Sequence, residues 1–108
     1  MKATMMEFFD EREVGKRECD EREFWKHECE VEFDLPHMSV SYTDWHNRVV
    51  TYHSVKVVSE SQWTLECPAV GGSASLHRST IAEDSGCLVG RYADDNYRGT
   101  WIIKFLIP

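Results

Sequence analysis

The fold is decided by the stretch NRVVTYHSVKVV, which spans residues 47–58. Nearly every residue in it is β-branched, aromatic or small, and such residues favour an extended strand. Side chains along a strand alternate between its two faces, so we expect the mainly aliphatic row from Val49 to Val57 to face the core. The mixed row with Tyr52 and Lys56 then faces outward. Polar turns flank this strand on both sides, so a meander of strands can extend from it in both directions.

Six further segments repeat this character between turn residues, at residues 27–35, 37–43, 62–67, 73–82, 87–92 and 100–107. The last of them is apolar on both faces apart from Lys104, which places it in the middle of a sheet or at the closure of a barrel. Seven or eight short strands predict a mainly β domain, either an antiparallel β-sandwich or a small up-and-down barrel. The predicted core comprises Val49, Val55, Val57, Trp63, Leu65, Trp101, Ile103 and Phe105.

The start of the chain has a mixed signal. Residues 1–26 form a charged N-terminal segment, and residues 27–107 form the β-meander core of a single domain that spans residues 1–108. Helix-forming residues dominate positions 5–22, but their apolar stripe is thin, and Gly15 weakens a helix there by about 1 kcal/mol relative to alanine. Both a strand and an N-terminal helix are open for this segment, and the helix would make the domain α+β.

An internal repeat lies in the same region. Residues 10–19, DEREVGKREC, match residues 20–29, DEREFWKHEC, at seven of ten positions. Two copies are too few to bury the continuous face of a solenoid. We therefore interpret the repeat as a local duplication of surface sequence, with a presented row of alternating charge as the functional alternative.

The charge of the chain excludes one class of partner and favours another. The net charge is −7, and residues 1–35 hold twelve acidic and six basic residues, which leaves the remaining residues nearly neutral. Nucleic acid is therefore not expected as a direct ligand, because phosphate binding needs a basic face, whereas a basic protein surface would be attracted. We expect no signal peptide and no membrane contact, and a cytoplasmic protein whose four cysteines are reduced.

The acidic residues of one segment fall on a single strand face. Over residues 27–35, four carboxylates alternate with apolar residues, so one face is apolar and the other wholly acidic. Aromatic and arginine side chains in turns add anchors of the type found in protein interfaces. The residues expected to bind a partner are Glu28, Glu30, Glu32, Asp34, Trp45, Tyr97 and Arg98.

No motif in the chain predicts catalysis, a metal or a cofactor. His27 and Cys29 share a strand face, but no C-x₂-C pair accompanies them, so Cys29, Cys67 and Cys87 are interpreted as buried free thiols. The residues around Ser73 lack the G-x-S-x-G spacing of a nucleophile elbow. The acidic loop at residues 94–96 lacks the alternating ligands of a calcium loop and is interpreted as a turn.

These observations favour a non-enzymatic protein that binds a protein partner with a basic surface through its acidic N-terminal third, such as an inhibitor or accessory factor of phage or mobile-element type. One alternative is a small-ligand-binding β-barrel whose cavity is lined by Tyr52, Trp63, Trp101 and Phe105. Another is a self-associating structural subunit, such as a homodimer, in which the C-terminal strand pairs with its own copy.

Overall fold

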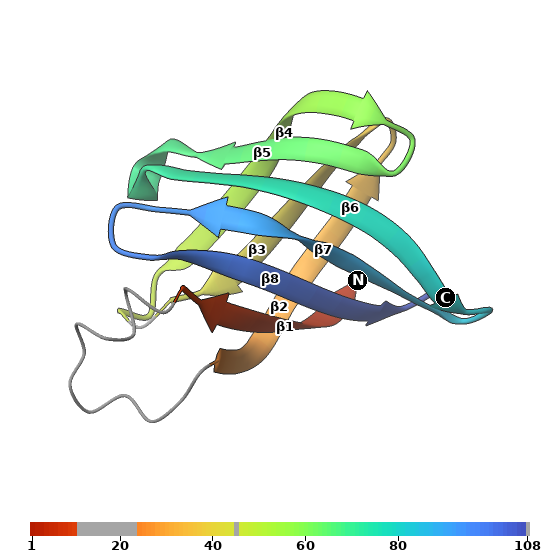
Figure 1. The fold of residues 1–108 in the computed structure, drawn as a ribbon, viewed down its shortest axis with the longest axis horizontal. Helices are drawn as coiled ribbons and strands as arrows, with labels where there is room; N and C mark the ends of the chain where they lie inside the picture. Colours follow the sequence, from red (N-terminus) through yellow and green to blue (C-terminus); the bar gives the residue numbers. More distant parts are fainter. Residues whose placement is uncertain (11–23, 45, 108) are drawn as a thin grey trace.

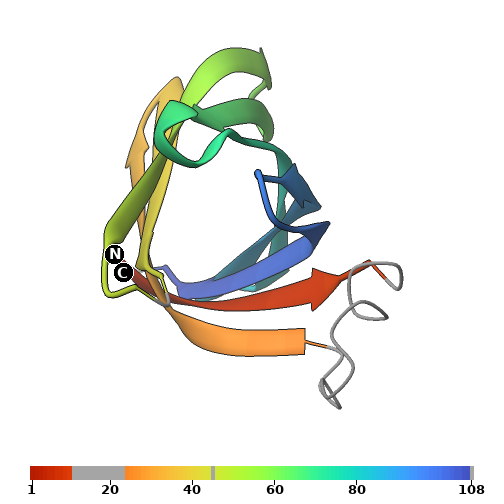
Figure 2. The ribbon, with the colours of Figure 1, turned by 90° about the vertical axis from the view of Figure 1, so that its left-hand side faces the viewer.

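The computed structural model describes residues 1–10, 24–44 and 46–107, and these form a closed antiparallel β-barrel (Figures 1 and 2). Each strand pairs with the next along the chain, and β1 pairs with β8 to close the barrel. The described strands are β1 (Lys2–Phe9), β2 (Phe24–Asp34), β3 (His37–Thr43), β4 (Val49–Ser59), β5 (Gln62–Cys67), β6 (Gly72–Ala82), β7 (Ser85–Ala93) and β8 (Arg98–Leu106), with a short 3₁₀ turn, η1 (Pro68–Val70), between β5 and β6.

The mainly β prediction is confirmed, and of its two forms the structure is the barrel. The C-terminal strand β8 is paired on both sides, with β7 and with β1, as its two apolar faces predicted. The N-terminal residues Lys2–Phe9 form strand β1 instead of the alternative helix, because they fill the position between β2 and β8 and pair with both. Most of the residues for which a helix was considered, and most of the repeat, lie outside the described residues.

Barrel closure fixes which side chains point inward. In β1 the inward row is Ala3, Met5 and Glu7, and all three are buried. Of the predicted core, Trp63, Leu65, Trp101, Ile103 and Phe105 are buried, and Val57 packs against the buried cluster.

The predicted orientation of β4 was wrong over its first half. Val49 and Val55 are 74% and 55% exposed, whereas Val50 and Tyr52 are buried. The reason is a register shift between residues 54 and 56 in the pairing of β4 with β5, where β4 advances two residues for one on its partner. The shift exchanges the two alternating rows, so Val57 pairs with the buried Trp63 although Val49 faces solvent.

The barrel has two distinct ends. Strands β1, β3, β5 and β7 finish at one end (Figure 1). Strands β2, β4 and β6 turn into the next strand at the other end, where β1 begins and β8 ends. We call the first the tyrosine end, because the inward-facing Tyr42, Tyr52 and Tyr92 all lie on the strand halves nearest to it.

A pair of matched substitutions tests the orientation of β4. Val50→Ala should lower the free energy of unfolding by about 2 kcal/mol because it leaves a cavity in the core. Val55→Ala should change it by less than about 0.5 kcal/mol because the side chain is largely exposed. Urea denaturation of both variants measures the difference, and equal losses would contradict the orientation described above.

Candidate functional site

A buried carboxylate lies inside the barrel at the tyrosine end. Glu7 is only 8% exposed, and it is the one charged residue among the buried positions of the described chain. Trp101 donates from Nε1 to Oε1 of Glu7 at 2.9 Å, and His27 donates from Nε2 to Oε2 at 3.0 Å. A buried carboxylate is costly unless donors replace its water, and these two bonds supply one donor for each oxygen.

Strand register brings these three residues together. Glu7 lies opposite Trp101 on β8, and Met5, the preceding inward residue of β1, lies opposite His27 on β2. Three adjacent strands therefore direct Glu7, His27 and Trp101 into the same part of the interior. Sequence reasoning missed Glu7, although its place in the alternating row with Ala3 and Met5 was a usable signal.

Three tyrosines surround the indole of Trp101. Tyr92 stacks on it with ring centroids 4.7 Å apart, Tyr52 meets it edge-on at 4.9 Å, and Tyr42 meets it edge-on at 6.1 Å. The hydroxyl of Tyr52 lies against the backbone of Gly72, where a Cβ would collide with it. These contacts define what we call the tyrosine cluster: Glu7, His27, Tyr42, Tyr52, Tyr92 and Trp101.

Two hydroxyls in the tyrosine cluster have no hydrogen-bond partner among the described protein atoms. They belong to Tyr52, which is fully buried, and Tyr92, which is 3% exposed. The Tyr42 hydroxyl is near enough to that of Tyr52 to act against the rise in the Tyr52 pKa, but the two hydroxyls do not meet hydrogen-bond geometry. Burying a polar group without a partner costs about 1 to 3 kcal/mol, so two such groups in one cluster indicate a place where a further molecule can bind.

Acidic groups act on the tyrosines at this end of the barrel. Burial, followed by the charges of neighbouring groups that include Glu7 and Asp94, raises the pKa of Tyr42, Tyr52 and Tyr92. Burial also raises the pKa of Asp94, although its carboxylate accepts backbone N–H groups from residues 96 and 97. The three tyrosines are therefore neutral hydroxyls at physiological pH.

His27 carries the counter-charge of Glu7. Burial acts to lower the pKa of His27, but the hydrogen bond and the charge of Glu7 outweigh it, so the pKa lies above the ordinary value of 6.5. His27 and Glu7 form an ion pair when the imidazole is protonated.

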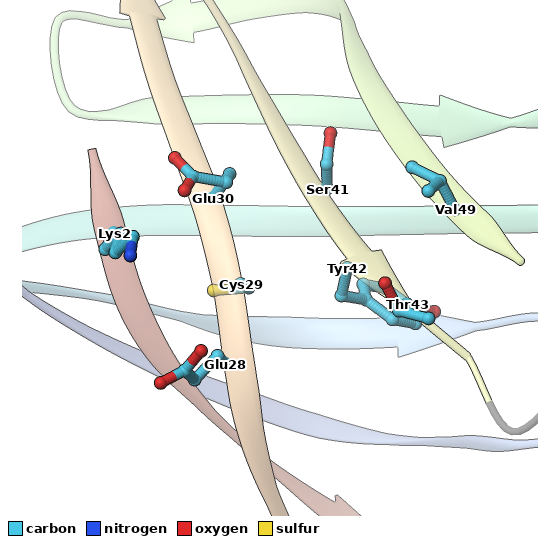
Figure 3. A pocket seen from close by; sticks show the side chains of 8 residues that line it. All are labelled: Lys2, Glu28, Cys29, Glu30, Ser41, Tyr42, Thr43 and Val49. Carbon is cyan, nitrogen blue, oxygen red and sulfur yellow. The ribbon is translucent and has the colours of Figure 1, made fainter. Parts of the chain in front are cut away.

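A pocket on the barrel wall reaches this cluster from outside. The ladder between β2 and β3 runs from the Asp34–His37 pair to the Glu30–Ser41 pair and stops there, while β2 continues along β1 and β3 continues along β4. A pocket of about 280 Å³ opens over this point (Figure 3). Its lining residues come from four neighbouring strands and are Lys2, Glu28, Cys29, Glu30, Ser41, Tyr42, Thr43 and Val49.

Tyr42 belongs to both the pocket and the tyrosine cluster. It lines the pocket, and its ring also lies 5.2 Å from that of His27 and 6.4 Å from that of Tyr52. The neighbouring Cys29 is buried, and burial raises the pKa of its thiol to about 12, so it is a neutral apolar group and not a nucleophile.

The predicted partner-binding residues are dispersed. Glu28, Glu30, Glu32 and Asp34 are exposed along the outer face of β2, and two of them also line the pocket. The N-terminal ammonium lies 3.5 Å from the carboxylate of Glu30.

The predicted aromatic anchors lie elsewhere. Trp45 is outside the described residues. Tyr97 is half-buried and packs on Phe9 with ring centroids 5.4 Å apart, while Arg98 is exposed at the start of β8, separated from β2 by β1.

The aromatic residues expected to line a cavity divide between the two ends. Tyr52 and Trp101 belong to the tyrosine cluster, whereas Trp63 and Phe105 contact Phe33 at the opposite end, at 5.9 and 5.6 Å. There the guanidinium of Arg78 lies 4.4 Å above the Phe33 ring, within the range of a cation–π contact.

Comparison with known proteins adds no assignment. No known protein family matches the chain, and the searches of curated proteins and of solved structures found no similar protein. Over residues 1–10, 24–44 and 46–107, no group of three or more histidine, cysteine or acidic residues is arranged to hold a metal ion. No helix in this part of the chain has the length and hydropathy needed to cross a membrane.

The Glu7–His27 pair makes stability depend on pH. The raised pKa of His27 in the folded state stabilises the protein at pH values below about 6.5, the pKa of histidine in the unfolded chain. This contribution is lost as the pH rises through the folded-state pKa of His27. In Glu7→Gln the charge is removed but burial remains, so the pKa of His27 should fall below 6.5. An NMR titration of His27 measures the shift, with Glu66→Gln, an exposed acid on β5, as the control. An unchanged His27 pKa in Glu7→Gln would contradict the ion pair.

Proposed function

We propose that the protein is a non-enzymatic β-barrel that binds a small ligand at the tyrosine cluster. The observation that carries this proposal is the pair of buried hydroxyls of Tyr52 and Tyr92, which have no partner among the described residues and which both feel the charge of Glu7. A bound molecule with hydrogen-bonding groups would satisfy both hydroxyls and recover the free energy that their burial costs. Ligand sites in proteins commonly combine apolar walls with a few convergent polar groups, and the tyrosine cluster has this composition.

The pocket between β2 and β3 supports the proposal because it supplies volume next to the cluster. Its 280 Å³ is close to the lower bound of about 300 Å³ for ordinary ligand pockets. Tyr42 is half-buried and lies between the pocket and the other residues of the cluster, so a rotation of this one side chain would connect the pocket with them.

The states of the reactive groups favour binding over catalysis. The thiol of Cys29 is held neutral by its raised pKa, and His27 is engaged with Glu7. A general base or nucleophile would need the opposite: a thiolate, or an imidazole free to accept a proton.

Filling the pocket tests this function. Thr43 is exposed and lines the pocket, so a tryptophan at this position should occlude it and weaken ligand binding by at least about tenfold. Thr80→Trp is the matched control, because Thr80 is an exposed strand threonine on β6, away from the pocket. A fragment library of cations, anions and neutral molecules, screened by protein-observed NMR, measures binding to both variants. The proposal would be contradicted if no fragment of the library bound at the tyrosine cluster, or if fragments bound there with the same affinity in Thr43→Trp as in the unaltered chain.

A second candidate function is binding to a basic protein partner through the acidic face of β2. Glu28, Glu30, Glu32 and Asp34 project outward along one strand, which is the arrangement that long-range steering of a cationic surface requires. The self-associating alternative receives less support, because β8 has strands on both sides and offers no free edge for a copy.

Ionic strength tests the second candidate. Changing Glu30 and Glu32 together to glutamine should slow association with a basic protein partner by about threefold in low salt. The free energy of unfolding should remain nearly unchanged. The difference should disappear as salt shortens the Debye length from about 10 Å at 0.1 M. Glu66 and Glu83 changed together to glutamine serve as the control, since both are exposed away from β2. Association rates that ignore salt, or a variant that only aggregates, would exclude this role.

A further inference from the structure

We infer that the ligand of the tyrosine cluster is a small organic cation, an amine or quaternary ammonium group on a compact apolar body, which reaches the cluster through the opening between β2 and β3. This inference rests on the proposed function and specifies its ligand. It follows from the hydrogen-bonding capacity, the ring faces and the charges of the cluster.

The hydrogen-bonding groups of the cluster have spare acceptor capacity. An ionised carboxylate can accept about four hydrogen bonds, and Glu7 receives one on each oxygen from Trp101 and His27. The hydroxyls of Tyr52 and Tyr92 can each accept as well as donate, and neither has a hydrogen-bond partner within the described part of the chain. A ligand with donors or a positive charge therefore finds more unused capacity here than one with acceptors alone.

Aromatic rings supply the second part of a cation site. The rings of Tyr42, Tyr52 and Tyr92 pack around Trp101 within 6.1 Å, and the quadrupole of such rings attracts ammonium groups that lie over their faces. Several aromatic side chains converging beside a carboxylate form the physical arrangement that binds methylated or primary amines. An anion would be opposed both by the ring faces and by Glu7.

The charges around the cluster agree with this geometry. Among the described titratable groups that act on it, Glu7, Asp94, Asp10 and Cys67 are acids and His27 is the base, while the three tyrosines are neutral. The acids already disfavour negative charge on the tyrosines, which is why they contribute to the raised tyrosine pKa values. The negative charges of the carboxylates among these acids would stabilise a bound cation.

The pocket provides access from the solvent. Glu28, Glu30 and Lys2 line it together with Tyr42 (Figure 3). The ring of Tyr42 lies 5.2 Å from that of His27, so Tyr42 forms the wall between the pocket and the rest of the cluster. The wall is a side chain at the point where the β2–β3 ladder has ended, so rotating it breaks no pair of that ladder. A cation that displaces Tyr42 would contact His27 and then Glu7.

His27 makes binding of the cation depend on pH. The groups that face it are Glu7 from β1, Tyr42 from β3, Trp25 on its own strand and the backbone carbonyl of Glu28. The imidazolium and a bound cation would compete for Glu7, so binding should favour the neutral imidazole. Affinity for a permanent cation should therefore rise as pH increases through the His27 pKa, and the rise should vanish in His27→Asn.

Three probes with a phenyl ring and different charge test the ligand class: benzyltrimethylammonium, benzyl alcohol and benzoate. The readout is the indole N–H signal of Trp101 in an NMR spectrum of the full chain, because this group donates to Glu7 and lies inside the cluster. We expect benzyltrimethylammonium to shift the signal with at least about tenfold higher affinity than benzyl alcohol, and benzoate to leave it unchanged.

Two variants separate a specific site from general attraction to an acidic protein. The double change of Tyr52 and Tyr92 to phenylalanine keeps both rings, and should weaken binding of benzylammonium, whose N–H groups can donate to the hydroxyls, by about threefold to tenfold. Benzyltrimethylammonium, which has no N–H group, should lose much less affinity in this variant. Glu7→Gln should weaken benzyltrimethylammonium binding by at least about tenfold. Tyr97→Phe, which removes the hydroxyl of the tyrosine outside the cluster, should leave affinity unchanged.

The outcomes distinguish the two proposals. Preferential binding of benzyl alcohol or benzoate at Trp101 would overturn the cation inference and leave small-ligand binding intact. The same holds if none of the three probes moves the Trp101 signal while other library fragments do. If no probe and no library fragment reaches Trp101, both proposals fail. Equal affinity of benzyltrimethylammonium for the unaltered chain and for Glu7→Gln would show surface attraction only and overturn the inference.

Discussion

The pairing of β1 with β8 is the constraint on which the rest of the structure depends. It joins the N-terminal strand to the C-terminal strand over seven residue pairs and turns a meander into a barrel. Once closed, a barrel has no edge, so every strand must direct one row of side chains into a single interior. The same pairing sets Glu7 opposite Trp101 and so builds the first contact of the tyrosine cluster.

Closure also explains why polar groups occur inside so small a protein. The interior is divided along its length: aliphatic and aromatic residues with Arg78 fill the end near the termini, and carboxylate, imidazole and hydroxyl groups occupy the other. A chain of 108 residues has few interior positions, and an apolar residue at position 7 would pack without the cost of burying a charge. A buried Glu7, next to two tyrosine hydroxyls without a partner in the residues that the structure describes, is understandable if the polar end serves binding more than stability.

Much of the fold could be predicted from sequence, because alternation in β5 and β8 is regular and long side chains such as Trp63 and Trp101 mark the inward row. The orientation of β4 could not, because valines occupy both of its rows and the irregular step near Val55 leaves no compositional mark. The candidate site was harder to predict from the sequence than the fold. Glu7 was counted with the surface acids of the N-terminal third, and the convergence of Tyr42, Tyr52 and Tyr92 depends on barrel register that local patterns do not contain.

The unequal ladders of the barrel have a kinetic consequence. Strand β3 is held by five residue pairs on each side, whereas nine pairs join β7 to each of its neighbours. Local opening takes place first where the fewest backbone bonds must break, so β3 belongs to the part of the wall that separates most readily. Because β3 also carries Tyr42, the residence time of a molecule inside the barrel would be set by how often this side chain turns aside on its weakly paired strand, and less by the strength of the contacts within.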